Sequence, residues 1–111
     1  MIRSVLALRA KDDCRAALED FYRDHRVLEI SRSFPGCLGA TLWRSVDTNR
    51  TTHLVIADWD DADAYHRWVT DPFRDKTSAG LAALLDLEPD EKIVGSLLEP
   101  VDPPTPALDG S

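Results

Sequence analysis

Residues 37–46 read CLGATLWRSV, residues 47–50 read DTNR and residues 51–59 read TTHLVIADW, and this continuous stretch decides the fold. Both longer segments contain Val, Thr and Trp, residue types that favour strands, and the four residues between them are polar. Two such segments joined by a short polar loop are typical of a β-hairpin. We therefore predict that residues 37–46 and 51–59 are antiparallel neighbours in one sheet.

The sequence before the hairpin predicts one strand and one helix. Residues 2–9 mix Ile, Val and Leu with single polar residues and end at a charged turn, as a strand does. From Asp13 onward apolar side chains recur at steps of three and four, which predicts one helix that is capped by Asp12 or Asp13 and ends at 34–36. One face of this helix carries Ala17, Leu18, Phe21, Tyr22, His25, Leu28 and Arg32.

The sequence after the hairpin predicts two helical segments and a last strand. An acidic pair at 60–61 is expected to cap a helix with Tyr65 and Trp68 three residues apart on one face. Pro72 suits a first helical position, so a further helix is expected from there to about residue 87. Residues 92–98 then form the fourth strand.

The order strand, helix, strand, strand, helix, strand is that of a ferredoxin-like βαββαβ sandwich, an α+β fold with an antiparallel sheet. We expect residues 1–99 to form this domain. Residues 100–111 contain four prolines and few apolar residues, which predicts a Pro-rich tail that is flexible or loosely docked.

The predicted strands are apolar on both faces, which indicates that both faces of the sheet are covered. Leu54 and Ile56 point one way, whereas Val55, Ala57 and Trp59 point the other way. The helices of the chain cover one face. The matching face of a second copy covers the other, which predicts a homodimer built as a dimeric α+β barrel. In the alternative, a monomer, the tail folds across this face.

Charge and composition limit the kinds of partner. The chain has 111 residues, enough for one core, and a formal net charge of -7, which argues against nucleic acid as a partner. No apolar run is long enough to span a membrane, and the first residues lack the apolar segment of a signal peptide, so we expect a cytoplasmic protein without membrane contact. Cys14 and Cys37 lack the spacing of a metal or redox site and are expected to be free.

Four motifs, taken in order and spacing, resemble the antibiotic biosynthesis monooxygenase superfamily, also called dimeric α+β barrels. They are Phe21-Tyr22-x-x-His25, FPGCLGA at 34–40, Trp59-Asp60-Asp61-x-x-x-Tyr65-x-x-Trp68, and Pro72-Phe73. The resemblance runs from residue 2 to residue 98 and implies a homodimer with one pocket per subunit between the sheet and its helices. Some members of the family oxidise anthrone-like aromatic polyketides to quinones with oxygen and without metal or flavin. Others degrade haem, and others have no established reaction.

The resemblance also favours the haem-free branch. The reactive tryptophan of the haem-degrading members corresponds to Trp68, but their haem-ligating histidine falls at Thr77. Their first-strand asparagine has no match, because the nearby residues are Ala7 and Leu8. A threonine hydroxyl is a poor substitute for imidazole as an iron ligand, so we expect no cofactor.

The candidate site residues are one base, several rings and several hydrogen-bond donors. His25 is the candidate base, because its ordinary pKa suits proton removal near neutral pH. Trp68 is the strongest candidate and is placed with His25 in the catalytic group. The expected substrate-binding residues are Tyr22, Trp43, Trp59, Tyr65, Phe73, Thr77 and Arg74, with Arg32 as an alternative to Arg74. Each also has a structural interpretation, as a core ring, a rim histidine or a solvated arginine. His53 and His66 complete three scattered histidines that make no metal site.

The sequence thus favours a cofactor-independent monooxygenase that takes a hydrophobic aromatic molecule, an aromatic polyketide or similar electron-rich phenolic compound. Oxygen reacts directly with such a compound only after a carbanion forms, so the protein would hold the substrate, remove a proton and exclude water. A cofactor-free cyclase or isomerase of the same substrates and a non-catalytic small-molecule-binding dimer stay open as alternatives. Haem degradation and a purely structural role are less favoured.

Overall fold

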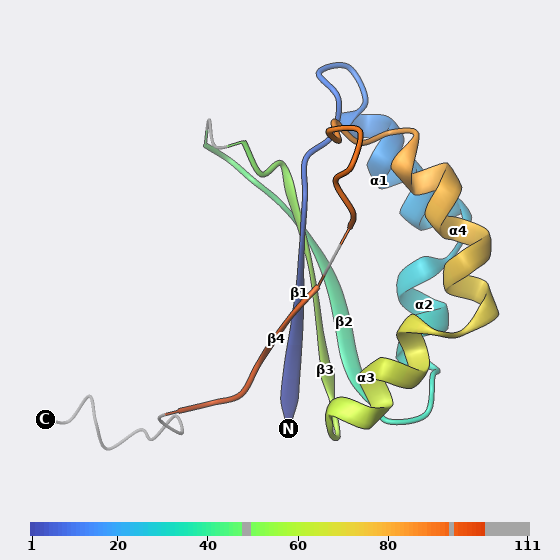
Figure 1. The fold of residues 1–111 in the computed structure, drawn as a ribbon, viewed down its shortest axis with the longest axis vertical. Helices are drawn as coiled ribbons and strands as arrows, with labels where there is room; N and C mark the ends of the chain where they lie inside the picture. The colour runs from blue at the N-terminus through green and yellow to red at the C-terminus, as the bar shows by residue number, and fades with distance from the viewer. Residues whose placement is uncertain (48–49, 94, 102–111) are drawn as a thin grey trace, which may run out of the picture.

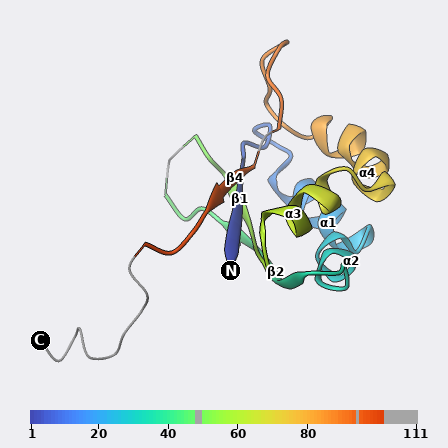
Figure 2. The ribbon, with the colours of Figure 1, turned by 60° about the horizontal axis from the view of Figure 1, so that its bottom comes forward.

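All the helices lie on one face of a single antiparallel sheet in the computed structural model, which describes residues 1–47, 50–93 and 95–101 (Figures 1 and 2). The elements, in chain order, are β1 (Ile2–Leu8), α1 (Arg15–Asp24), α2 (Val27–Arg32), β2 (Cys37–Arg44), β3 (His53–Trp59), α3 (Ala62–Val69), α4 (Pro72–Ala82) and β4 (Ser96–Leu98). The four strands lie in the order β2-β3-β1-β4. The predicted α+β, ferredoxin-like fold is confirmed.

The antiparallel β2–β3 hairpin confirms the prediction from residues 37–59. Thr41 lies opposite Ile56, and a bulge shifts the register between Cys37 and Gly39. β1 then pairs with the other edge of β3 along its whole length and with the short β4 on its far side. Residues 48–49 of the predicted hairpin loop lie outside the described residues.

The single first helix that periodicity predicts is wrong, because the chain breaks into α1 and α2. Arg26 has φ 52°, a left-handed conformation that a right-handed helix cannot contain. The cap prediction is also wrong, since Cys14 precedes α1 without a side-chain hydrogen bond. The break turns the chain so that α2 runs along β2.

The second helical half follows the prediction more closely. Asp61 caps α3 by accepting a hydrogen bond from Ala64 N at 2.9 Å, and Asp71 caps α4 from just before Pro72. α4 ends at Ala82, earlier than the predicted residue 87. The chain then turns inward and buries Leu85, which is 2% exposed and forms a bridge to Ala10.

Two packed clusters hold the helices on the sheet. One joins β1, α1 and the end of α4 through Leu8, Leu18, Tyr22, Leu81 and Leu85. The other joins β2, β3 and α3 through Ala40, Ala57, Trp59, Ala64 and Trp68. Glycines permit the closest approaches, because a β-carbon at Gly80 of α4 would lie 2.8 Å from Phe21 Cε2 of α1.

The opposite face of the sheet carries no helix. We call it the open face. Its apolar side chains are Val5, Trp43, Leu54, Ile56 and Leu98, and the Arg3–Asp58 ion pair lies on it beside Leu98. Trp43 is 57% exposed and Leu98 is 50% exposed. Within the described ranges, no helix is long and apolar enough to cross a bilayer.

Candidate functional site

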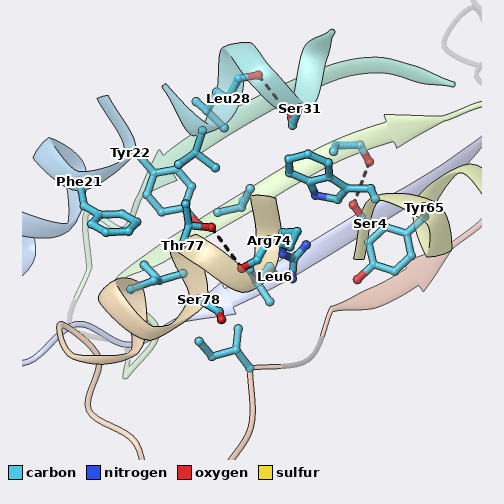
Figure 3. Close-up of a pocket in the computed structure, with 16 residues that line it drawn as sticks. Ser4, Leu6, Phe21, Tyr22, Leu28, Ser31, Tyr65, Arg74, Thr77 and Ser78 are labelled. Carbon is cyan, nitrogen blue, oxygen red and sulfur yellow. Dashed lines mark hydrogen bonds between the residues drawn. The ribbon is translucent and has the colours of Figure 1, made fainter. Parts of the chain in front are cut away.

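A cavity of about 120 Å³ lies between the helices and the sheet (Figure 3). Its floor is formed where β1 and β3 present small side chains, because Ser4 lies opposite Ala57 in the sheet. Its apolar walls come from the sheet, α2, α4 and the segment before β4, through Leu6, Val27, Leu28, Val55, Leu81 and Ile93. The small floor residues leave the space that larger strand side chains would fill.

Trp68 of α3 forms the aromatic end of the cavity. Its ring is 5% exposed and is held by Phe34 at 5.3 Å, Phe73 at 5.9 Å and Trp59 at 6.4 Å between ring centroids. Trp59 lies behind it and donates its indole N–H to Ser4 Oγ at 3.0 Å. The indole N–H of Trp68 has no acceptor among the described residues. Trp68 therefore presents both a flat surface and a free donor.

Arg74 of α4 brings a positive charge to the cavity. Its guanidinium carbon lies 5.9 Å from the centre of the Trp68 ring, within the range of a cation–π contact. It forms no ion pair with any residue in the described part of the chain. The cation is thus half-buried, steadied by an aromatic ring and not neutralised by an acidic side chain.

Tyr22 of α1 adds a neutral hydroxyl. Burial raises the pKa of its phenol to about 12, and the nearby Arg74 opposes part of this rise. Tyr22 therefore stays protonated at neutral pH and can donate a hydrogen bond. Tyr65 of α3 also lines the cavity, and its hydroxyl lies so close to Gly95 that a β-carbon there would force the tyrosine side chain to move.

The other hydroxyls of the cavity are already bonded to the backbone. Thr77 donates to Phe73 O at 3.0 Å and Ser31 donates to Leu28 O at 3.3 Å. Ser78 donates to Asp75 O at 3.1 Å. These hydroxyls can still accept a hydrogen bond from a ligand, but each already donates its proton to a backbone carbonyl.

The structure brings together five of the nine candidate site residues, Tyr22, Tyr65, Trp68, Arg74 and Thr77, around the cavity. Trp59 and Phe73 pack against Trp68 and are not among the residues that line the cavity, so their predicted contact with substrate stays a prediction. Trp43 lies on the open face and not in the cavity, because β2 turns its side chain away from the helices.

The prediction that His25 faces the pocket is also wrong. α1 ends one residue before it, and the left-handed Arg26 follows, so His25 is exposed and stacks on Phe21 at 4.3 Å between ring centroids. Arg32, the alternative to Arg74, is also outside, donating to Ala40 O at 2.8 Å. Sequence reasoning missed Ser4, Phe21 and Ser31 as lining residues. Ser31 lies three positions after Leu28, a spacing that was available as a signal.

The cavity does not fit the ligation of haem iron by histidine, because no histidine lines it. Thr77 occupies the position expected for that ligand, and its hydroxyl is bonded to Phe73 O. No group of three or more His, Cys, Asp or Glu side chains in the described ranges is arranged to hold a metal ion. His53 is fully buried elsewhere, between Thr52 Oγ1 and Glu19 Oε2, each at 2.8 Å.

A family model described as "Antibiotic biosynthesis monooxygenase" matches residues 1–75. Among curated protein sequences, none matches this chain.

Solved structures share the fold over nearly the whole chain. Rv0793 from Mycobacterium tuberculosis is similar with a TM-score of 0.73 and 17% identity, covering 94% of this chain and 98% of that one. SnoaB from Streptomyces nogalater, a cofactor-independent oxygenase, has a TM-score of 0.70 and 21% identity, covering 91% and 93%. PA3566 from Pseudomonas aeruginosa has a TM-score of 0.70 and 22% identity, covering 91% and 94%. At these identities the likeness shows the shared fold.

Proposed function

Because this chain belongs to the antibiotic biosynthesis monooxygenase family, we propose that it is a cofactor-independent monooxygenase of an aromatic polyketide or similar electron-rich phenolic compound. One observation carries this proposal. The cavity joins the flat face of Trp68 to the unpaired charge of Arg74, which suits an aromatic ring bearing an oxygen that becomes negative. SnoaB, which shares the fold, is a cofactor-independent oxygenase.

The proposed reaction inserts one oxygen atom at an activated carbon of the substrate. The substrate anion gives one electron to oxygen, and the resulting substrate radical and superoxide combine into a peroxide anion, which takes up a proton from water to give the hydroperoxide. Loss of water from the hydroperoxide, with the remaining hydrogen of the same carbon, leaves a carbonyl, so that one oxygen atom ends in the product and the other in water. The substrate supplies all the electrons that reduce oxygen, so the proposed reaction needs no electrons from a metal or flavin.

The protein holds the substrate, stabilises the negative charge on its oxygen and excludes water from it. Trp68 stacks on the ring, while Arg74 and Tyr22 place donors around the negative oxygen. Leu6, Val55 and Leu81 exclude water, which strengthens these electrostatic contacts. Tyr65 and Thr77 complete the polar rim.

Oxygen uptake tests the proposal. The protein is expected to accelerate oxygen consumption by anthrone or by substituted hydroquinones, and Trp68→Ala should lower kcat/KM by at least tenfold. His25→Ala is a matched control, because His25 lies outside the cavity and its loss should leave the rate unchanged. No acceleration across a series of anthrones and hydroquinones would refute the proposal. Product formation in the absence of oxygen would instead indicate a cyclase or isomerase.

A non-catalytic binding protein is the second candidate, and one observation favours it. Among the described residues that line the cavity, none is a His, Asp, Glu, Lys or Cys, the usual side chains for removing a proton. Tight binding of phenolic ligands without oxygen uptake would support this alternative.

We also propose that two copies pair through the open face. On the open face, exposed Trp43 lies opposite half-buried Leu54, and Ile56 lies opposite Val5, so these apolar side chains are neighbours, and exposed apolar patches mark interfaces. A second copy offers the same surface, so a two-fold arrangement covers both at once.

A further inference from the structure

The unpaired polar groups of the cavity are all hydrogen-bond donors. Ser31, Thr77 and Ser78 already donate to backbone carbonyls. Within the described part of the chain, four lining groups have no hydrogen-bond partner: the guanidinium of Arg74, the indole N–H of Trp68 and the hydroxyls of Tyr22 and Tyr65. A cavity with this set is prepared for an acceptor, and the charge of Arg74 makes a negative acceptor the best match.

In the part of the chain that the structure describes, no residue lining the cavity takes a proton at neutral pH. The titratable groups that face it are Tyr22, Tyr65 and Arg74, and burial raises the pKa of Tyr22 to about 12, so its phenolate is not available as a base. Asp71 is bound to the N-terminus of α4 through Phe73 N at 3.0 Å. The remaining charged side chains of α3 and α4 lie at the exposed surface: Asp63, His66, Arg67, Asp75 and Lys76.

The size of the cavity sets how much of a ligand it encloses. An apolar cavity of about 150 Å³ is known to accept benzene, so a cavity of about 120 Å³ suits one aromatic ring. Ser78 is the exposed member of the lining, which places the mouth beside α4. Additional rings of a larger substrate would extend through this mouth.

From these observations we propose that the cavity selects the ionised form of its ligand, an acidic phenol or enol that has already lost its proton in water, with one ring enclosed against Trp68. The negative oxygen lies at Arg74, with Tyr22 as a second donor. This inference rests on the proposed function for its chemical purpose and deepens it by naming the substrate class. A compound of the same shape that cannot ionise is a poor ligand.

Binding of a coloured phenol provides a test without turnover. The probe is 4-nitrophenol, which ionises near neutral pH and whose anion absorbs visible light. Its methyl ether, 4-nitroanisole, has a similar shape and cannot ionise. We expect the bound phenol to titrate at least about 1 pH unit below the free phenol, which is a tenfold preference for the anion. The ether should bind at least tenfold more weakly than the phenolate.

Three variants test whether Arg74 causes the shift in the titration of bound 4-nitrophenol. Arg74→Gln should abolish the shift, and Arg74→Lys, which retains the charge, should retain part of it. Arg67→Gln is the matched control, because Arg67 is an exposed arginine of α3 that does not line the cavity, and its shift should equal that of the wild type. Equal affinity for phenol and phenolate, no binding of the phenolate, or loss of the shift in Arg67→Gln as well would each overturn the inference.

The outcome separates this inference from the proposed function. A shift that depends on Arg74, together with no oxygen uptake by anthrones or hydroquinones, would support anion selection and refute the monooxygenase. Oxygen uptake that is unchanged in Arg74→Gln, with no shift for 4-nitrophenol, would support the monooxygenase and refute anion selection.

Discussion

Glu19 of α1 is predicted to link the stability of the protein to acidic pH. Its carboxylate accepts from Arg44 Nη2 at 2.5 Å and Nε at 2.7 Å, and it lies 2.8 Å from Nε2 of the fully buried His53. It therefore ties α1 to both strands of the β2–β3 hairpin. The hydrogen bond from Arg44 is the main reason that the pKa of Glu19 falls to about 2 from its ordinary 4.5, with burial opposing the fall.

The sign and size of the effect follow from this pKa. A carboxylate with a lower pKa in the folded state stabilises the protein above its unfolded pKa, and this stabilisation is lost as pH falls from about 4.5 to about 2. At 1.36 kcal/mol per unit the whole shift corresponds to about 3 kcal/mol. Arg44 is 65% exposed and water screens the pair, so we expect about 1 to 2 kcal/mol from Glu19.

Urea unfolding followed by tryptophan fluorescence, at fixed protein concentration and at a series of pH values, measures this contribution. Glu19→Gln should lower the free energy of unfolding at pH 7 by about 1 to 2 kcal/mol and flatten its decline between pH 4.5 and pH 2. The matched control is Glu29→Gln, since Glu29 pairs with exposed Arg26 on the surface and should leave the curve almost unchanged. Parallel curves for Glu19→Gln and wild type would refute the reasoning.

Three further predictions concern other parts of the fold. Ile56→Asp places a charge on the open face and should convert the proposed dimer to monomer in light scattering, whereas Ala79→Asp on exposed α4 should not; a dimer in both would contradict pairing through the sheet. Gly36→Ala should lower stability in thermal unfolding by about 2 kcal/mol, because Gly36 has φ 89° and a β-carbon there would lie 2.5 Å from Ala64 Cβ. Gly39→Ala, where no atom lies within 4 Å of such a carbon, should have little effect, and equal losses would contradict the steric explanation. Ala57→Val should reduce the affinity for 4-nitrophenol at least tenfold in calorimetry by filling the cavity floor, and unchanged affinity would place the ligand elsewhere.

The hairpin and the position of Trp68 were predictable because both depend on local patterns. Strand residues around a polar loop and two rings three positions apart on a capped helix remain informative without knowledge of distant contacts. His25 shows where such reasoning fails. Periodicity extends a helix through it, and nothing about an arginine at position 26 indicates a left-handed residue, a conformation set by the packing of α2 on β2. The same break therefore made two predictions wrong, the single first helix and the position of His25 facing the pocket.

Trp43 shows a second limit. Alternation along a strand divides side chains between two faces, but it does not say which face the helices cover. A bulge shifts the register between Cys37 and Gly39, and the glycine inside the strand pattern was its only local signal. The resemblance implied a pocket between the sheet and its helices, but the residues of its floor were not predictable, since Ser4 meets Ala57 across two strands that are distant in sequence.

Because Ser4 and Ala57 form the floor, the volume of the cavity is set by different residues from those that contact the ligand. Ser4 and Ala57 belong to the sheet, and the backbone bonds between β1 and β3 do not depend on which side chains they carry. Trp68 and Arg74 belong to the helical layer above. Evolution or an engineer can therefore resize the chamber by changing one or two strand positions while the groups that contact the ring and its charged oxygen stay in place. Proteins with this architecture can diverge in substrate without redesigning their chemistry.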